Sequence, residues 1–288
     1  MFSSIKCKKL INLFFFTAQE ESLILKRIVQ LICVVLISFL FVAKPQATDI
    51  SSDKESYNAY LSLPEGSEPF PVIALSHGAG GLKGTLYVWA KKFTAWGFAT
   101  IVLDHYAPRG FGSYNRMGTQ DSFEYRRDDL ISILKIIKND QRFDDEKVTL
   151  AGWSRGAGFV GHGIMDEEVR EEANFEHPIK AAVLFYPQNN TFFRNFDEEF
   201  NLPVILLMGS EDYIWVHGWK SQWTEYKSKI HPLVLKVYEG ATHLFDAEKI
   251  LRKRCRQSEY DMHCFQYDAV AHKQSIKDLK TFLTKYAK

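Results

Sequence analysis

Between Val148 and Val160 the chain reads VTLAGWSRGAGFV, the clearest local pattern in its 288 residues. Val148 to Ala151 is a short apolar run of the kind that forms a buried strand. Gly152 to Gly156 then match G-x-S-x-G, and small residues suited to a closely packed helix follow. A strand, a sharp turn and a helix hold the serine of this pattern in a strained backbone conformation, with its hydroxyl clear of the sheet. Ser154 is therefore the first candidate nucleophile.

The pentapeptide alone is weak support, because a glycine-rich turn with an ordinary serine cap has the same sequence. The rest of the chain supplies the context. Apolar runs without polar alternation recur along it, separated by segments with helical spacing. Strands are expected at 57–63, 71–75, 98–103, 148–151, 179–186, 203–208 and 233–238, and helices at 86–96, 122–138, 156–165 and 268–286. Residues 48–56 are expected to be a connecting segment and the acidic residues 166–176 a solvated face.

Continuous apolar strands that alternate with helices are typical of a mostly parallel sheet covered by helices on both faces. The predicted fold class is therefore α/β, with residues 48–288 as a single domain. The interval from Pro187 to Asn201 is too short for a large cap domain. Ligands of such sheets bind at the carboxyl ends of the strands. Gly78, Ser154, Asp212 and His243 each follow the end of a different predicted strand, so the fold is expected to gather them.

Ser154, Asp212 and His243 also occur in the chain order nucleophile, acid, histidine. A serine hydroxyl needs a base, and a neutral imidazole oriented by a carboxylate supplies one. We predict Ser154 as nucleophile, His243 as base and Asp212 as its acid. The alternatives are Glu211 and Asp104 for the acid, and His217, His231 and His263 for the base, whereas Asp246 follows His243 too closely to serve as its acid.

Acyl transfer also needs donors for the oxyanion. The backbone N–H of Arg155, directly after the nucleophile, is one candidate. The second is expected in the glycine-rich loop from His77 to Gly81, where we select Ala79 with Gly78 as the alternative. The competing interpretation of this loop is a flexible turn.

Residues 57–286 resemble the dienelactone hydrolase family of α/β-hydrolases. The resemblance rests on these motifs: SHGAGGL at 76–82, DHYAPRG at 104–110, GWSRG at 152–156, GSED at 209–212, GATHLF at 240–245 and the pair Tyr267-Asp268. It implies the α/β-hydrolase fold and a catalytic triad.

The name-giving enzymes of that family use a cysteine nucleophile, where this chain has Ser154, and a glutamate in the loop that here carries Gly78. The resemblance places Arg109 near one of the arginines that hold a substrate carboxylate and Ala247 at the place of the other. We assign substrate binding to Gly78, Trp153, Arg109 and Tyr213.

The first 47 residues differ from the rest and are predicted to be a leader. Ile28 to Ala43 is a 16-residue run with two polar side chains, preceded by Lys26 and Arg27. As a helix it would rise about 24 Å, which is short for a bilayer core of about 30 Å. These features favour an export signal. An uncleaved anchor and a buried helix are the alternatives, and either of the first two interpretations predicts an exported or membrane-associated protein.

Cys255 and Cys264 lie close together in the sequence and are a candidate disulfide in an oxidising compartment, with two unpaired thiols as the alternative. They belong to the segment 246–268, which is long for a connection and rich in Lys and Arg. A solvated face is expected there, with contact to an anionic membrane surface as the alternative.

Formal net charge is +1, so no global electrostatic attraction to nucleic acid is expected. No cofactor is predicted, and no metal either, since no histidine and carboxylate cluster has ligand spacing along the chain. The sequence thus predicts an exported serine hydrolase that cleaves small esters or related acyl bonds. A peptidase or acyltransferase with the same triad, and a catalytically silent binding domain, are the alternatives.

Overall fold

The computed structural model describes residues 46–52, 55–111, 123–163, 167–177, 179–188, 201–259 and 261–288. The predicted export segment at 28–43 lies outside these residues, so the leader and the domain boundary after residue 47 stay predictions. Within the described ranges, no helix has both the length and the apolar character needed to cross a bilayer.

An eight-stranded sheet forms the centre, in the order β1-β2-β4-β3-β5-β6-β7-β8. Its strands are β1 (Gln46–Ser52), β2 (Glu55–Ser62), β3 (Phe70–Ser76), β4 (Ala99–Leu103), β5 (Phe143–Trp153), β6 (Ala181–Phe185), β7 (Val204–Gly209) and β8 (Leu233–Tyr238). The pairs β1–β2 and β2–β4 are antiparallel, and all other neighbours are parallel. The predicted mostly parallel α/β sheet is confirmed.

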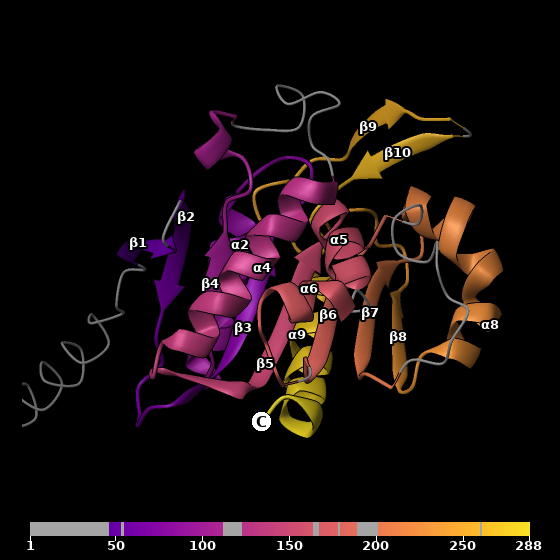
Figure 1. The fold of residues 1–288 in the computed structure, drawn as a ribbon. Helices are drawn as coiled ribbons and strands as arrows, with labels where there is room; N and C mark the ends of the chain where they lie inside the picture. Colours follow the sequence, from indigo (N-terminus) through magenta and orange to yellow (C-terminus); the bar gives the residue numbers. More distant parts are fainter. Residues whose placement is uncertain are drawn as a thin grey trace, which may run out of the picture. The chain divides into compact units, whose positions relative to one another are not determined.

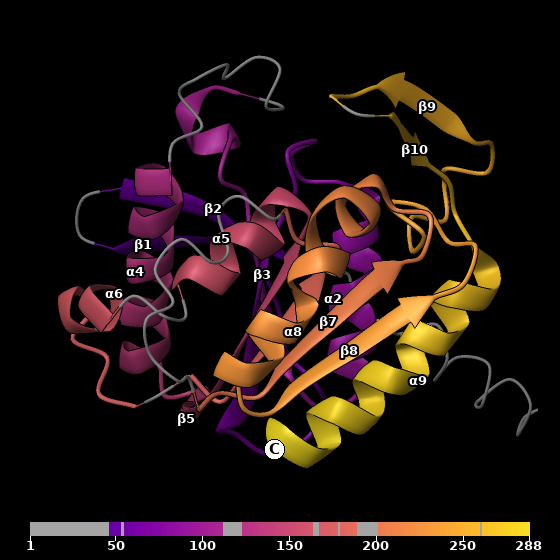
Figure 2. The ribbon, with the colours of Figure 1, turned by 90° about the vertical axis from the view of Figure 1, so that its right-hand side faces the viewer.

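Helices cover both faces of this sheet (Figures 1 and 2). The helical segments are α2 (Gly84–Ala95), η1 (Ala107–Arg109), α4 (Phe123–Asn139), α5 (Arg155–Gly163), α6 (Glu167–Glu172), η3 (Trp215–Trp219), α8 (Lys220–Lys229) and α9 (Ala269–Tyr286). Helices α2 and α9 lie on one face, and α4 and α5 on the other. Helix α2 buries Leu86, Trp89, Ala90 and Phe93, the i, i+3, i+4, i+7 spacing of an apolar stripe.

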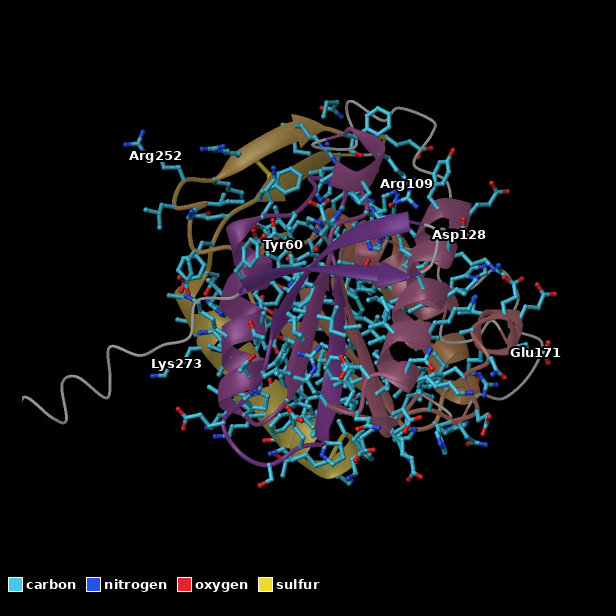
Figure 3. The ribbon with its side chains drawn as sticks, turned by 60° about the vertical axis from the view of Figure 1, so that its left-hand side comes forward. Tyr60, Arg109, Asp128, Glu171, Arg252 and Lys273 are labelled. Atoms are coloured by element: carbon cyan, nitrogen blue, oxygen red, sulfur yellow. A yellow bond between two sulfur atoms is a disulfide. The ribbon has the colours of Figure 1, made fainter. Side chains whose placement is uncertain are left out.

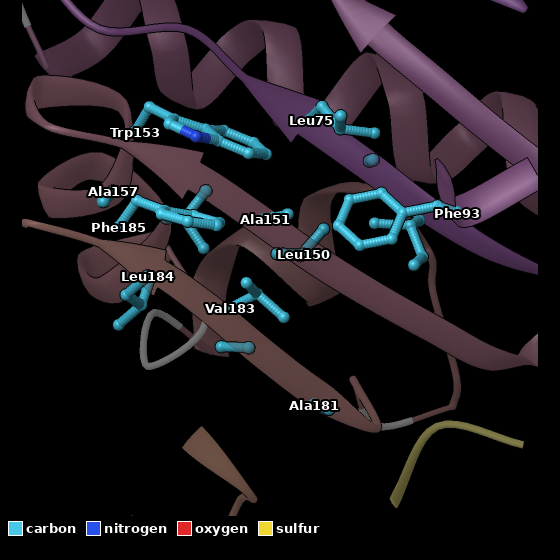
Figure 4. Packing of buried hydrophobic residues seen from close by; sticks show 14 of the residues in the cluster. Leu75, Phe93, Leu150, Ala151, Trp153, Ala157, Ala181, Val183, Leu184 and Phe185 are labelled. Carbon is cyan, nitrogen blue, oxygen red and sulfur yellow. The ribbon is translucent and has the colours of Figure 1, made fainter. Parts of the chain in front are cut away.

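The core lies on both sides of the central strands, which explains why their sequences lack polar alternation (Figure 4). Every residue of β6 is buried. On one face of β5 and β6, the Trp153 and Phe185 rings stack with centroids 4.8 Å apart. Burying side chains of this size stabilises the fold by about 1.5–3 kcal/mol each.

The prediction of a connecting segment at 48–56 is wrong. These residues form β1 and the start of β2, an antiparallel pair in which Gln46 lies opposite Leu61. Backbone hydrogen bonding to β2 holds β1, which pairs with no other strand of the described sheet. A strand at the sheet edge needs no continuous apolar run, and its sequence QATDISS has none.

The segment 246–268 contains a hairpin where a long connection was expected. Strand β9 (Arg254–Gln257) pairs antiparallel with β10 (Met262–Phe265), and Cys264 lies opposite Cys255, to which it is joined by a disulfide. All of β9 is exposed, and Arg252, just before it, extends away from the body of the protein (Figure 3). Strands of four residues are too short to show a clear periodicity, and β9, with the sequence RCRQ, also lacks an apolar run.

Two further regions are more helical than predicted. The acidic stretch contains α6, which buries Val169 and exposes Glu168 and Glu171. Helices η3 and α8 connect β7 to β8. The described residues hold no cap domain, and the residues between 188 and 201 lie outside them.

Candidate active site

The loops that carry the predicted site residues begin at the carboxyl ends of paired parallel strands. Ser76, the last residue of β3, pairs with Gly152 in β5. Gly209, the last residue of β7, pairs with Tyr238 at the end of β8. Because parallel strands end at one edge of the sheet, the loops after these four strands converge there.

Ser154 occupies the sharp turn between β5 and α5. Its φ is 51°, in the left-handed region that non-glycine residues rarely adopt. The flanking glycines make the turn possible. A Cβ on Gly152 would lie 2.5 Å from the Gly156 carbonyl oxygen, and a Cβ on Gly156 would overlap the Ser76 carbonyl oxygen. The G-x-S-x-G pattern is thus required by close backbone packing on both sides of the serine.

The three predicted side chains form one hydrogen-bonded relay. Ser154 Oγ lies 3.0 Å from His243 Nε2, and His243 Nδ1 lies 2.7 Å from Asp212 Oδ2. The carboxylate fixes the tautomer, so Nδ1–H donates to Asp212 and Nε2 accepts from the hydroxyl. Asp212 is fully buried, and its Oδ1 accepts the backbone N–H of Ile214 at 2.9 Å. The relay therefore runs from a buried carboxylate to a serine at the pocket.

The alternative acids and histidines have other surroundings. Glu211 is exposed and pairs with Lys253 at 3.5 Å. Asp104 accepts the N–H groups of Tyr106 and Ala107. His231 is exposed and bonds the Ser228 carbonyl, and His217 is exposed beside Tyr213.

Asp246, which was excluded as the acid by its closeness to His243 in the sequence, lies at the centre of a buried hydrogen-bond network. Its carboxylate accepts the indole N–H of Trp89 and of Trp153, each at 2.8 Å, and the Tyr186 hydroxyl at 2.7 Å. Burial, together with the Asp246 charge, raises the pKa of Tyr186, which therefore stays a donor. Asp246 anchors the side chain preceding the nucleophile and does not orient His243.

Of the two predicted oxyanion donors, Arg155 directly follows Ser154, and Ala79 lies in a loop that lines the same pocket. Arg155 is the first residue of α5, so its N–H belongs to the group that points out of the helix N-terminus. The loop carrying Gly78 and Ala79 crosses close over the turn, because a Cβ on Gly78 would lie 3.1 Å from the Trp153 carbonyl oxygen and 3.3 Å from Ser154 Cβ. This contact explains the glycine at position 78.

A pocket of about 570 Å³ opens at Ser154 and His243. Leu86 and Val88 of α2, Leu244, and Phe265 of β10 contribute apolar surface. Lys83, Lys249 and Arg256 add three cations from separate segments. The β9–β10 hairpin thus forms part of the pocket wall.

The predicted substrate-binding residues separate into two groups. Gly78 and Trp153 line the pocket. Trp153 is only 2% exposed and its indole N–H donates to Asp246, so its side chain is part of the core. Arg109 does not line this pocket, because its guanidinium donates to both carboxylate oxygens of Asp129 at 2.9 and 3.1 Å. Tyr213 is also outside the lining and stacks on His263, with centroids 5.3 Å apart.

A second Ser–His–Asp constellation lies inside the molecule, unpredicted from sequence. Ser76 Oγ is 2.8 Å from His105 Nε2, and His105 Nδ1 is 2.6 Å from Asp129 Oδ2. All three are at most 2% exposed. The buried guanidinium of Arg126 donates to the His77 carbonyl at 2.9 Å. This network holds the base of the loop that carries Gly78 and Ala79.

His263 completes a cluster that sequence spacing did not indicate. Its Nε2 lies 3.9 Å from Asp212 Oδ1, and its ring meets that of His243 edge-on at 4.8 Å. Asp212, His243 and His263 can each direct one ligand atom to a common centre, with these atoms within 4.8 Å of one another. Spacing along the chain does not indicate this cluster, because the hairpin brings His263 to Asp212 from a separate segment.

Burial lowers the pKa of His263 to about 4, with the charge on His243 acting in the same direction. The imidazole is therefore neutral at physiological pH. The sequence indicated His263 only as an alternative base, and the disulfide-linked hairpin places it beside Asp212 instead.

Comparisons with known proteins agree with this architecture. A curated relative, an uncharacterized 31.7 kDa protein from the traX-finO intergenic region of Escherichia coli, is 33% identical over 99 residues. That match spans about a third of either protein, 34% of each.

Two solved structures share the fold. Dienelactone hydrolase from Anabaena variabilis has a TM-score of 0.58 and 13% identity, covering 85% of this chain and 99% of that one. Est1E from Butyrivibrio proteoclasticus, with ferulic acid bound, has a TM-score of 0.57 and 15% identity, covering 83% and 98%. Residues 57–287 match the model of the dienelactone hydrolase family. The chain, with its α/β-hydrolase sheet, belongs to the dienelactone hydrolase family.

Proposed function

We propose that this protein is a serine hydrolase that cleaves carboxylic esters through an acyl-serine intermediate. The observation that carries the proposal is the relay of Ser154, His243 and Asp212, with contacts of 3.0 and 2.7 Å, at a pocket of about 570 Å³. Family membership supports the same reaction class.

In the acylation step, Ser154 Oγ attacks the ester carbonyl carbon while His243 Nε2 takes the hydroxyl proton. Asp212 stabilises the imidazolium that forms, because it already accepts the Nδ1 proton. The N–H groups of Arg155 and Ala79 are the proposed donors to the oxyanion, aided by the positive end of α5. When the tetrahedral intermediate collapses, the ester C–O bond breaks and His243 returns its proton to the leaving alcohol.

Deacylation repeats these steps with water. His243 takes a proton from water, hydroxide attacks the acyl carbon, and the Ser154 oxygen leaves with the proton returned by His243. The products are a carboxylic acid and the regenerated enzyme.

The pocket lining supports a small substrate with an apolar part. Leu86, Val88 and Phe265 offer an apolar surface within the pocket, and its volume falls in the usual range for small-molecule sites. We propose small esters as the substrate class, with the carbonyl at Ser154.

The direct test is labelling with a fluorophosphonate, which reacts with activated serines. We expect wild type to be labelled and Ser154→Ala to be unlabelled. The matched control is Ser76→Ala, which removes the serine of the buried constellation and should leave labelling of the folded protein in place. Labelling retained in Ser154→Ala would contradict the proposal.

Turnover of a panel of model esters and peptides then separates the remaining alternatives. Ester hydrolysis lost in Ser154→Ala supports the esterase. Cleavage of peptides but not of esters would show that the protein is a peptidase. Absence of both labelling and turnover would favour a binding domain.

We further propose that the protein is exported. The basic residues before the apolar run at 28–43 support this, as does the Cys255–Cys264 disulfide, which suits an oxidising compartment. Cell fractionation with mass spectrometry of the N-terminus tests it. A mature N-terminus near residue 48 supports a cleaved signal and a full-length membrane-bound chain supports an anchor, whereas a cytoplasmic protein contradicts export.

A further inference from the structure

His263 faces the acid end of the catalytic relay from the β9–β10 hairpin. Its side chain is 7% exposed, yet Nε2 has no hydrogen-bond partner among the described residues. Asp212 Oδ1 lies 3.9 Å from this nitrogen, and the His243 ring lies edge-on beside the His263 ring. A buried imidazole nitrogen directed at a carboxylate, with a second imidazole adjacent, is a ligand arrangement that the hydrolytic mechanism does not use.

We propose that Asp212, His243 and His263 form an inhibitory binding site for a divalent transition metal such as Zn²⁺. The inhibition rests on the proposed hydrolytic function, whereas metal binding does not. Two imidazole nitrogens and one carboxylate oxygen are a donor set that suits Zn²⁺, with a fourth position left for water.

The spacing of the donors is close to what such an ion requires. Tetrahedral zinc with bonds of about 2.0–2.1 Å holds its ligand atoms about 3.3 Å apart. One donor atom from each of the three residues already lies within 4.8 Å of the others, and the His263–Asp212 separation is 3.9 Å. A shift of about an ångström, carried mainly by the exposed hairpin, would close the site.

The surroundings orient the ligands and leave an entry path. The His263 ring lies between Tyr213, with centroids 5.3 Å apart, and Phe265, at 4.4 Å. The Ile214 N–H holds Asp212 Oδ1. His243 and His263 both line the pocket, so an ion approaches from that side, and the buried ligand atoms must separate slightly to admit it. Arg256 on the same hairpin opposes a cation, but it is exposed and therefore screened.

Metal binding would block proton transfer from Ser154. The His243 nitrogen that faces the carboxylate is Nδ1. An ion bound there leaves the single proton of the neutral ring on Nε2, which then has no lone pair to accept the Ser154 proton. The serine loses its base without any bond to the metal.

The binding test uses calorimetric titration of Zn²⁺ into the purified full-length, metal-free protein. We expect one ion per chain in wild type. Loss of a ligand in His263→Phe, which keeps a ring between Tyr213 and Phe265, should weaken binding at least 10-fold. His263→Gln should do the same, and thermal melting verifies that both variants fold. His231→Gln, which removes an exposed histidine, is the control for surface binding and should keep the wild-type affinity. Absence of one-site binding, or equal affinity in His263→Phe, overturns the site.

The inhibition test measures the rate of fluorophosphonate labelling against Zn²⁺ concentration, each variant being normalised to its own metal-free rate. The concentration that halves the rate should rise at least 10-fold in His263→Phe and be unchanged in His231→Gln. Zinc binding with no effect on labelling overturns the inhibitory role. A metal-free protein that is not labelled at all contradicts the hydrolase proposal, and calorimetry still decides the metal site.

Discussion

Two Ser–His–Asp constellations among the residues that the structure describes have nearly equal hydrogen-bond distances. In one, Ser154, His243 and Asp212 have contacts of 3.0 and 2.7 Å. In the other, Ser76, His105 and Asp129 have contacts of 2.8 and 2.6 Å. Distances alone therefore do not distinguish a candidate catalytic relay from a structural one.

What differs is the placement of the serine. Ser154 lies in a strained turn with φ of 51°, at a helix N-terminus and on a pocket. Ser76 ends a buried strand and is 1% exposed, so no substrate reaches it. The same arrangement of side chains thus suits nucleophilic attack at Ser154. At Ser76 it forms a fully hydrogen-bonded polar network that supports the loop containing Gly78 and Ala79.

The largest expected effect comes from breaking the relay at the pocket. Asp212→Asn presents an amide to His243 Nδ1 and favours the wrong tautomer, and such a change lowers kcat about 10⁴-fold in a working triad. Initial rates on a model ester check this. Melting temperatures should remain near wild type, and a rate within 10-fold of wild type would contradict the role of Asp212.

The equivalent change in the buried constellation should act on stability. Asp129→Asn leaves His105 and the guanidinium of Arg109 without their carboxylate. Breaking a buried ion pair costs about 3–5 kcal/mol. Urea unfolding measures the loss, and labelling per folded molecule should fall far less than in Asp212→Asn. An unchanged unfolding midpoint with lost labelling would reverse the two roles.

Removing the inner serine should have a smaller effect. Ser76→Ala leaves His105 Nε2 without its buried donor, at a cost of about 1–3 kcal/mol in the free energy of unfolding. Denaturant titration gives that cost. In the matched variant Ser154→Ala, the free energy of unfolding should stay within about 1 kcal/mol of wild type, while all labelling is lost. Comparing the two variants distinguishes an effect on stability from an effect on catalysis.

The smallest effect concerns His77, between the two constellations. Burial lowers its pKa, against the opposing influence of Asp104. The neutral ring uses both nitrogens, since Nδ1–H donates to the Gly78 carbonyl and Nε2 accepts the His105 N–H. NMR titration of the ring should give a midpoint below 6.5, and a midpoint at or above 6.5 would contradict the buried neutral form.

The lowered pKa of His77 also determines how stability changes with pH. As pH falls below about 6.5, the unfolded chain takes up the proton first, so stability is full above that pH and declines toward the folded-state pKa. At pH 6, His77 accounts for a loss of at most about 0.8 kcal/mol in the free energy of unfolding, relative to its value at high pH. Chemical unfolding at pH 6 and pH 8 measures the total decline, to which other buried histidines such as His272 add in the same direction.

Most of the sheet and the relay was accessible from sequence because each rests on local chemistry. Buried parallel strands such as β6 require continuous apolar runs, and the turn at Ser154 requires the flanking glycines. Strands β1 and β9 were missed because backbone pairing, rather than an apolar run, defines them. Arg109 was assigned to substrate from a motif, although in the folded chain its charge pairs with Asp129.

The sequence by itself determined the α/β class, the strand-turn-helix at Ser154 and the order of the relay residues, since backbone sterics and burial leave few alternatives at those positions. Only the tertiary structure decided which of the other acids and histidines come into contact. Asp129, His105 and Ser76 come from three distant segments, as do His263 and the relay that it faces. These contacts depend on the conformations of loops and of a hairpin that contains a disulfide. Neither residue propensity nor hydrophobic periodicity predicts those conformations.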